Sequence, residues 1–214
     1  MDEDISIINS NTRNERIKNF FINNKKKLIL SLTLIILIVI FYFGYNEIQG
    51  NKNKSLALKY NNTIIKFDPL NKLNVKNELI EIIYEKNSTY SPLALYFIID
   101  NEIQTSNEEI NNYFDVLINE TDLDKEFKNL IIYKKGLFNS NFETENNLIA
   151  ILKPIINSES IWKSHALYLI AEYFFDKNQK QKAKEFFNQI ISNEKSNAKI
   201  VSESKKRLIR DFNE

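Results

Sequence analysis

The stretch Leu28–Tyr45, LILSLTLIILIVIFYFGY, contains 18 residues without a charged side chain. As a helix it spans about 27 Å, close to the hydrocarbon thickness of a bilayer. Thirteen of its residues are Leu, Ile, Val or Phe, and together they favour membrane insertion by about 4 to 8 kcal/mol. The hydroxyls of Ser31 and Thr33 can bond back to the helix backbone. The sequence therefore predicts a transmembrane helix over 28–45, with Leu28, Leu37, Phe41 and Tyr45 among its anchoring residues.

A buried helix of a soluble protein and a cleaved signal peptide are the two alternatives for this stretch. A core helix seldom lacks a polar face over such a length. Signal cleavage requires small residues just after the apolar segment, and the first alanine of the chain is Ala57. An uncleaved signal anchor is therefore the favoured interpretation.

The charges on the two sides of the span predict its orientation. Six basic residues precede it within about 15 residues, namely Arg13, Arg16, Lys18, Lys25, Lys26 and Lys27, and three follow, namely Lys52, Lys54 and Lys59. The positive-inside rule then places residues 1–27 in the cytoplasm and 46–214 outside, in the periplasm of a bacterium with two membranes. The basic stretch 13–22, with Phe20 and Phe21, either lies on the inner leaflet or is a disordered tail.

The composition favours helices and excludes several kinds of site. Basic and acidic residues nearly balance, 29 against 28, so no nucleic-acid partner is expected. The chain has only 3 Gly and 3 Pro, too few turn residues for most strand-rich folds. It has no Cys, which excludes disulfides and thiolate metal sites. The excess of Asn, Lys and Ile is typical of an AT-rich genome and indicates no mechanism.

Apolar periodicity predicts helices along the rest of the chain. Residues 46–67 continue or restart a helix, and Ser106 is an N-cap with Glu108 and Glu109 in the first turn of the helix that follows. The other predicted helices are 73–86, 92–104, 124–138, 144–153, 161–175, 180–192 and 196–212. Pro69, Pro92 and Pro154 are expected near helix ends. Short connections make antiparallel hairpins, and hairpins in series make an α-solenoid.

Residues 164–197 fit the tetratricopeptide repeat pattern. Leu167, Ile170, Ala171 and Phe174 occupy the large, large, small and aromatic positions of a first helix. Ala183 and Phe187 occupy the small and aromatic positions of the second helix. A weaker pair covers 90–119, with Ala94 as its small residue. The predicted organisation is a tail (1–27), a transmembrane helix (28–45), juxtamembrane helices (46–89) and a tetratricopeptide-like domain (90–214).

This order of parts resembles the ancillary SecYEG translocon subunit family of tetratricopeptide-like, single-pass bacterial membrane proteins. The resemblance is carried mainly by residues 150–212, including Leu152-Lys153-Pro154 and Ile161-Trp162-Lys163-Ser164-His165-Ala166. It implies an inner-membrane protein whose periplasmic domain binds other proteins, translocon subunits or chaperones, beside the secretion channel. The alternative is a self-assembling structural component of the cell envelope, with homo-oligomers.

Nothing in the motifs points to an enzyme. His165 is the only histidine, and one histidine without cysteine cannot build the usual metal or nucleophile sites. Gly44, Gly50 and Gly136 form no phosphate-binding loop. We therefore expect no catalytic residue, cofactor or metal, and a helical hydrolase or transferase is the least favoured hypothesis. Trp162 is interpreted as a core anchor, and Tyr113 and Tyr133 are candidate exposed residues of a binding face.

Overall fold

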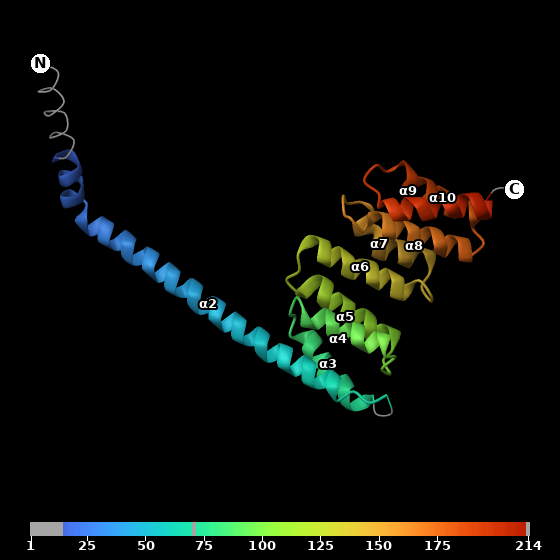
Figure 1. Cartoon of the computed structure of the whole chain (residues 1–214), viewed down its shortest axis with the longest axis horizontal. Coiled ribbons are helices and arrows are strands. Elements are labelled where there is room, and N and C mark those ends of the chain that lie inside the picture. The colour runs from blue at the N-terminus through green and yellow to red at the C-terminus, as the bar shows by residue number, and fades with distance from the viewer. Residues whose placement is uncertain (1–14, 70–71, 213–214) are drawn as a thin grey trace, which may run out of the picture. The chain divides into compact units, whose positions relative to one another are not determined.

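The computed structural model describes residues 15–69 and 72–212, which form helices and no strands (Figure 1). The predicted tail 1–27 therefore lies partly outside the described residues. The chain divides into two compact units, Met1–Ser55 and Leu56–Glu214. Helix α2, Lys25–Ile65, carries the chain from the first unit into the second.

The first unit contains a short helix and most of α2. Residues 15–23 are helical, and a turn at Asn24 separates them from α2. The 41 residues of α2 include the whole predicted span, and Ser31 Oγ and Thr33 Oγ1 donate to the carbonyls of Leu28 and Ile29 as expected. Among the described residues, α2 is the one helix long and apolar enough to cross a membrane, and none of its apolar window is buried. Of the anchor residues, Leu37, Phe41 and Tyr45 are exposed and Leu28 is half-buried.

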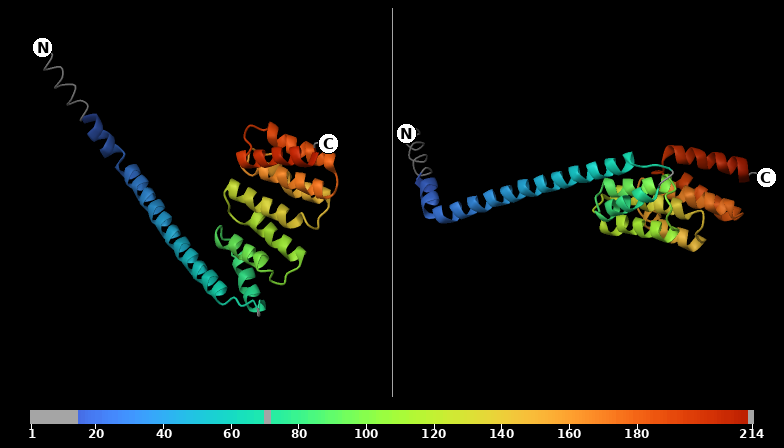
Figure 2. Two further views of the ribbon diagram at one scale, coloured as in Figure 1. Left: turned by 45° about the vertical axis from the view of Figure 1, so that its right-hand side comes forward. Right: turned by 90° about the horizontal axis from the view of Figure 1, so that it is seen from below.

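The second unit contains the end of α2 and eight further described helices, which follow one another in chain order (Figure 2). Consecutive helices from α3 to α10 pack against each other. Their bounds are α3 Leu73–Tyr84, α4 Tyr90–Asp100, α5 Asn107–Glu120, α6 Lys125–Asn139, α7 Glu145–Ile156, α8 Lys163–Asp176, α9 Lys180–Ser192 and α10 Ala198–Phe212.

Helices α5, α6 and α7 each start with a side-chain cap. Ser106 and Glu109 form a complete capping box at the start of α5, as the sequence predicts at Ser106. Asp124 caps α6, its Oδ1 accepting from the Phe127 amide at 2.9 Å. Thr144 caps α7 through the Asn147 amide. These caps determine where α5, α6 and α7 begin.

Several predicted helix bounds differ from those observed by two to four residues. Helix α4 ends at Asp100 instead of residue 104, because Glu102 has a left-handed backbone, φ 49°. Helix α7 passes through Pro154 to Ile156 instead of ending at residue 153. Proline removes one helix hydrogen bond, but the next residue, Ile155, is fully buried and its burial favours the extra turn. Helix α8 begins at Lys163, after an exposed Ile161.

Two hydrophobic clusters form the core of the second unit. The first is built from buried residues between Leu56 and Ile131, so the last turns of α2 belong to the core. The second is built from buried residues between Ile132 and Ile190. Both faces of α6 are used, since Ile131 lies in the first cluster and the adjacent Ile132 in the second. Helix α6 therefore joins the two halves of the unit.

The contact of α6 with α7 depends on a glycine. A methyl group at Gly136 would lie 2.5 Å from Cδ2 and 2.9 Å from Cγ of Leu152. Leu152 is fully buried, so it has little room to move away. The absence of a side chain at Gly136 thus allows the two helices to approach closely.

We predict that Gly136→Ala destabilises the second unit by about 1 kcal/mol. The alanine gains about 1 kcal/mol of helix propensity, but overpacking against Leu152 costs about 1–3 kcal/mol. In a Leu152→Ala background the same substitution should become stabilising, because the obstacle has gone. Denaturant unfolding of the full chain in detergent measures both values. Gly50→Ala is the matched control, since it meets nothing within 4 Å; an unchanged sign in the Leu152→Ala background would refute the explanation.

Candidate functional site

The six residues assigned to repeat packing all lie in the core. Leu167, Ile170, Ala171 and Phe174 on α8, and Ala183 and Phe187 on α9, are each buried in the second hydrophobic cluster. The rings of Phe174 and Phe186 stack at 5.5 Å with an interplanar angle of 10°. These residues hold α8 and α9 together and are not available to a ligand.

The two tyrosines proposed for a binding face are not exposed. Tyr113 is only 5 % exposed and packs edge-on against Tyr84, so that prediction is wrong. The reason is periodicity: Tyr113 follows Ile110 by three residues and lies on the same apolar face of α5. Tyr133 is half-buried and stacks on Trp162, with ring centroids 5.7 Å apart.

Tyr133, Trp162 and His165 form an aromatic cluster between α6 and the start of α8. The rings of Trp162 and His165 are 5.1 Å apart, and those of Tyr133 and His165 are 6.0 Å apart. The Nδ1 atom of His165 is buried and has no hydrogen-bond partner among the described residues. Burial lowers the pKa of His165, with a smaller opposing contribution from the backbone at Ile161. The cluster is therefore mainly apolar packing around a neutral imidazole.

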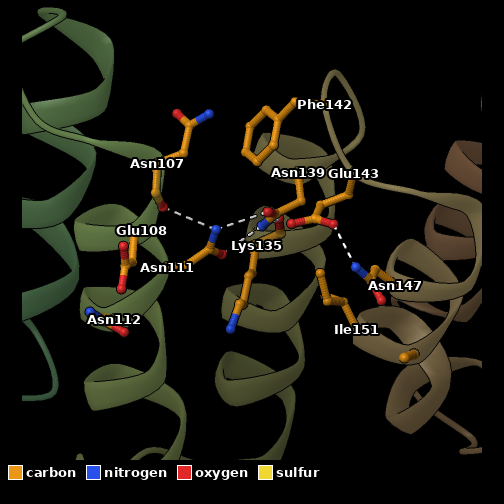
Figure 3. Close-up of a pocket in the computed structure, with 11 residues that line it drawn as sticks. Asn107, Glu108, Asn111, Asn112, Lys135, Asn139, Phe142, Glu143, Asn147 and Ile151 are labelled. Carbon is orange, nitrogen blue, oxygen red and sulfur yellow. Dashed lines mark hydrogen bonds between the residues drawn. The ribbon is translucent and has the colours of Figure 1, made fainter.

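An open groove with many polar side chains crosses α5, α6 and α7, with a volume of about 550 Å³ (Figure 3). Its residues come from the first half of α5, the end of α6, the α6–α7 loop and the first half of α7. The lining consists of Asn107, Glu108, Asn111, Asn112, Lys135, Asn139, Phe142, Glu143, Asn147, Ala150 and Ile151. Five of these side chains are primary amides, so we call it the amide groove.

A reciprocal pair of asparagines joins α5 to α6 at the base of the groove (Figure 3). Asn111 Nδ2 donates to Asn139 Oδ1 at 2.9 Å, and Asn139 Nδ2 donates to Asn111 Oδ1 at 2.7 Å. Each Nδ2 also donates to the carbonyl four residues earlier in its own helix, Asn107 O at 3.0 Å and Lys135 O at 2.7 Å. All four amide hydrogens are thus used, which is what a residue as buried as Asn139, 1 % exposed, requires.

The groove has an acidic rim. Glu108 is exposed, and Glu143 is half-buried and accepts from Asn147 Nδ2 at 2.7 Å. The one lysine of the lining, Lys135, forms an ion pair with Asp115 at 2.7 Å. Near the rim, hydrogen bonds from the Ser106 backbone and side chain lower the pKa of Glu109. Two carboxylates thus face one already paired ammonium, and the groove favours cationic groups in a ligand.

No pattern in the sequence predicts the amide groove. The abundance of asparagine indicates a compositional bias only, whereas in the structure five asparagines line one surface. A weak signal existed, since Asn107 and Asn111 are four residues apart on the polar side of an amphipathic helix. Nothing in the sequence indicated that Asn139, 28 residues further on, would meet Asn111.

Among residues 15–69 and 72–212, no group of three or more His, Cys, Asp or Glu side chains is arranged to hold a metal ion. Comparison with protein-family models, curated proteins and solved structures gives no match to this chain.

We predict that Asn111 and Asn139 are energetically coupled. Asn139→Ala should lower the free energy of unfolding by about 1–3 kcal/mol, because it leaves the amide of Asn111 without its partner. The double variant should be less destabilised than the sum of the single variants, with a coupling of at least about 0.5 kcal/mol. Asn112→Ala, exposed on the same helix, is the control and should change stability by less than about 0.5 kcal/mol. Additive single effects would show that the pair does not act as a unit.

We predict that His165 makes the stability of the fold depend on pH. Because burial lowers the pKa of His165 in the folded state, the unfolded chain takes up the proton first as the pH falls. The stabilisation that comes from neutral His165 is fully present above 6.5, the pKa of histidine in the unfolded chain. It is lost as the pH falls towards the lower pKa of His165 in the folded chain. We expect thermal unfolding to show decreasing stability between about pH 7 and pH 5, and His165→Gln to flatten this dependence. An equal slope in the variant would assign the effect to other groups.

Proposed function

We propose that this chain is a non-enzymatic, membrane-anchored scaffold that binds extended polypeptide segments, with α2 as the anchor and a tetratricopeptide-like α-solenoid as the binding domain. On this proposal the domain lies in the periplasm, and its partners are translocon subunits or chaperones of the secretion machinery. The amide groove is the observation that carries the proposal.

Primary amides suit an extended main chain. Each asparagine offers a carbonyl acceptor and an NH₂ donor, which match the alternating N–H and C=O groups of a peptide independently of its side chains. Asn107 and Asn112 are exposed at the rim, and the Asn111–Asn139 pair holds the floor rigid. The partly exposed Phe142 and Ile151 provide apolar contact, and Glu108 and Glu143 favour basic residues in the segment.

The helix contacts support repeat-like stacking in the second half of the domain. Helix α6 contacts α8, and α8 contacts α10, in addition to the contacts between neighbours. The hairpins α6–α7 and α8–α9 therefore stack on one another, as repeats in a solenoid do. Support is weaker for the pair 90–119, since α4 packs more extensively on α3 than on α5.

Membrane anchoring and the secretion setting have separate support. The unburied apolar window of α2 supports the anchor, and the excess of Arg and Lys before the span supports a cytoplasmic N-terminus. The resemblance of residues 150–212 to ancillary translocon subunits supports the secretion machinery as the setting. Tethering would raise the local concentration of the groove where chains emerge from the membrane.

Site-specific photocrosslinking in native membranes tests the proposal. A benzophenone amino acid in place of Asn112, at the groove rim, should capture a protein other than this chain. The same group in place of Lys184, exposed on α9 and outside the groove, should not. Asn107→Ala combined with Asn147→Ala should weaken capture about tenfold, which corresponds to the loss of one or two hydrogen bonds.

Other outcomes would overturn parts of the proposal. Adducts formed only between copies of this chain would favour the self-assembling envelope component. Because the chain contains no cysteine, Asn112→Cys provides a unique thiol for the topology. A membrane-impermeant maleimide should label it in intact spheroplasts; labelling only after lysis would put the groove in the cytoplasm and refute the secretion role.

A further inference from the structure

An apolar cleft lies where the short helix 15–23 meets the start of α2. Its volume is about 610 Å³, and it is lined by Phe21, Ile22, Lys25, Leu28, Ile29, Ser31, Leu32 and Ile35. All of these residues belong to the first unit, Met1–Ser55. Apart from the Ser31 hydroxyl, which bonds to the Leu28 carbonyl, Lys25 provides the one polar side chain of the lining.

The turn at Asn24 produces this cleft. The backbone amide and Nδ2 of Asn24 both donate to the Phe20 carbonyl at 3.0 Å, and the Asn24 carbonyl accepts from the Leu28 amide at 2.9 Å. The chain changes direction here between the short helix and α2 (Figure 1). Phe21 and Ile22 are thereby presented beside the first turns of α2 instead of continuing its axis.

The short helix itself is amphipathic. Ile17, Phe20 and Phe21 follow the spacing i, i+3, i+4 and are 50 %, 57 % and 57 % exposed. Arg16 and Lys18 flank this face, and Lys25, Lys26 and Lys27 follow the turn. A short helix with aromatic residues on one face and basic residues at its edges suits the headgroup level of a membrane.

We propose that this elbow, formed by residues 15–35, binds an anionic phospholipid of the cytoplasmic leaflet. One acyl chain lies in the apolar cleft along Leu28, Leu32 and Ile35, and the phosphate pairs with Lys25 at its polar end. The arrangement matches the ligand, because an acyl chain needs an apolar channel parallel to the span while the headgroup needs a cation at the interface. The proposal rests on the membrane anchoring proposed above.

Tryptophan quenching by brominated lipids tests the site in the full chain. Leu32 lines the cleft and Leu34 does not, yet both are 59 % exposed and two residues apart in α2. Leu32→Trp and Leu34→Trp are each reconstituted in bilayers that contain brominated phosphatidylglycerol or brominated phosphatidylcholine. The constant signal of Trp162, the one native tryptophan, is subtracted from both.

We expect the tryptophan at position 32 to report about a fivefold preference for the anionic lipid, the value expected for one lysine close to a headgroup charge. The tryptophan at position 34 should show almost none. Lys25→Gln should abolish the preference at position 32, whereas Lys26→Gln, which removes the same charge beside the cleft, should leave most of it.

Equal quenching by both lipids at position 32 would overturn the lipid site while leaving the membrane anchor intact. An equal effect of Lys25→Gln and Lys26→Gln would also overturn it, because the preference would then come from general surface charge. No quenching by either lipid at positions 32 and 34 would refute the anchor itself, and with it both proposals.

Discussion

Close packing between helices that are neighbours in the chain is the constraint on which the second unit depends. The chain has no cysteine, so no disulfide holds one helix to another. Each apolar face must be covered by the adjacent helices, and that requires small residues where helices meet. Gly136 lies close against Leu152, and Ala171 and Ala183 are fully buried on α8 and α9. Because interiors are close-packed, an added methyl group at Gly136 meets a Leu152 side chain that has little room to move.

The amide groove follows from the same packing. Helix α6 is buried through Ile131 in one cluster and Ile132 in the other, and its C-terminal end carries Asn139 between α5 and α7. A buried amide is tolerated only when all its hydrogen bonds are made, and the reciprocal bond to Asn111 meets that requirement. The resulting floor is rigid and polar, while the rim offers further amides and two carboxylates. A surface of this kind can bind a main chain through the amides, while the carboxylates of Glu108 and Glu143 favour basic side chains.

The first unit contains most of the described helix that is long and apolar enough to cross a membrane. None of the apolar window of α2 is buried, and exposure of so many large apolar side chains to water over this length is unfavourable. Within α2 the backbone groups bond to one another, and the hydroxyls of Ser31 and Thr33 donate to backbone carbonyls of the same helix. A bilayer requires that every polar group be satisfied internally, and α2 meets this requirement. The proposed lipid site at the Asn24 turn lies at the end of this helix where the basic residues gather. The residues proposed to anchor the chain are therefore separate from those proposed to bind a polypeptide, because the former must suit a bilayer and the latter must present polar groups to water.

Local patterns in the sequence were sufficient for the all-helical class, the apolar helix, the Ser106 cap and the approximate bounds of α3 to α10, because periodicity and capping depend on residues three or four apart. They also identified the residues of α8 and α9 that prove to be buried. They could not identify the amide groove, since Asn111 and Asn139 are 28 residues apart and meet only through the rotation and spacing of α5 and α6. The closeness of Gly136 to Leu152 and the burial of Tyr113 were likewise decided by tertiary packing, which determines the side of each helix that faces a neighbour and how near that neighbour comes.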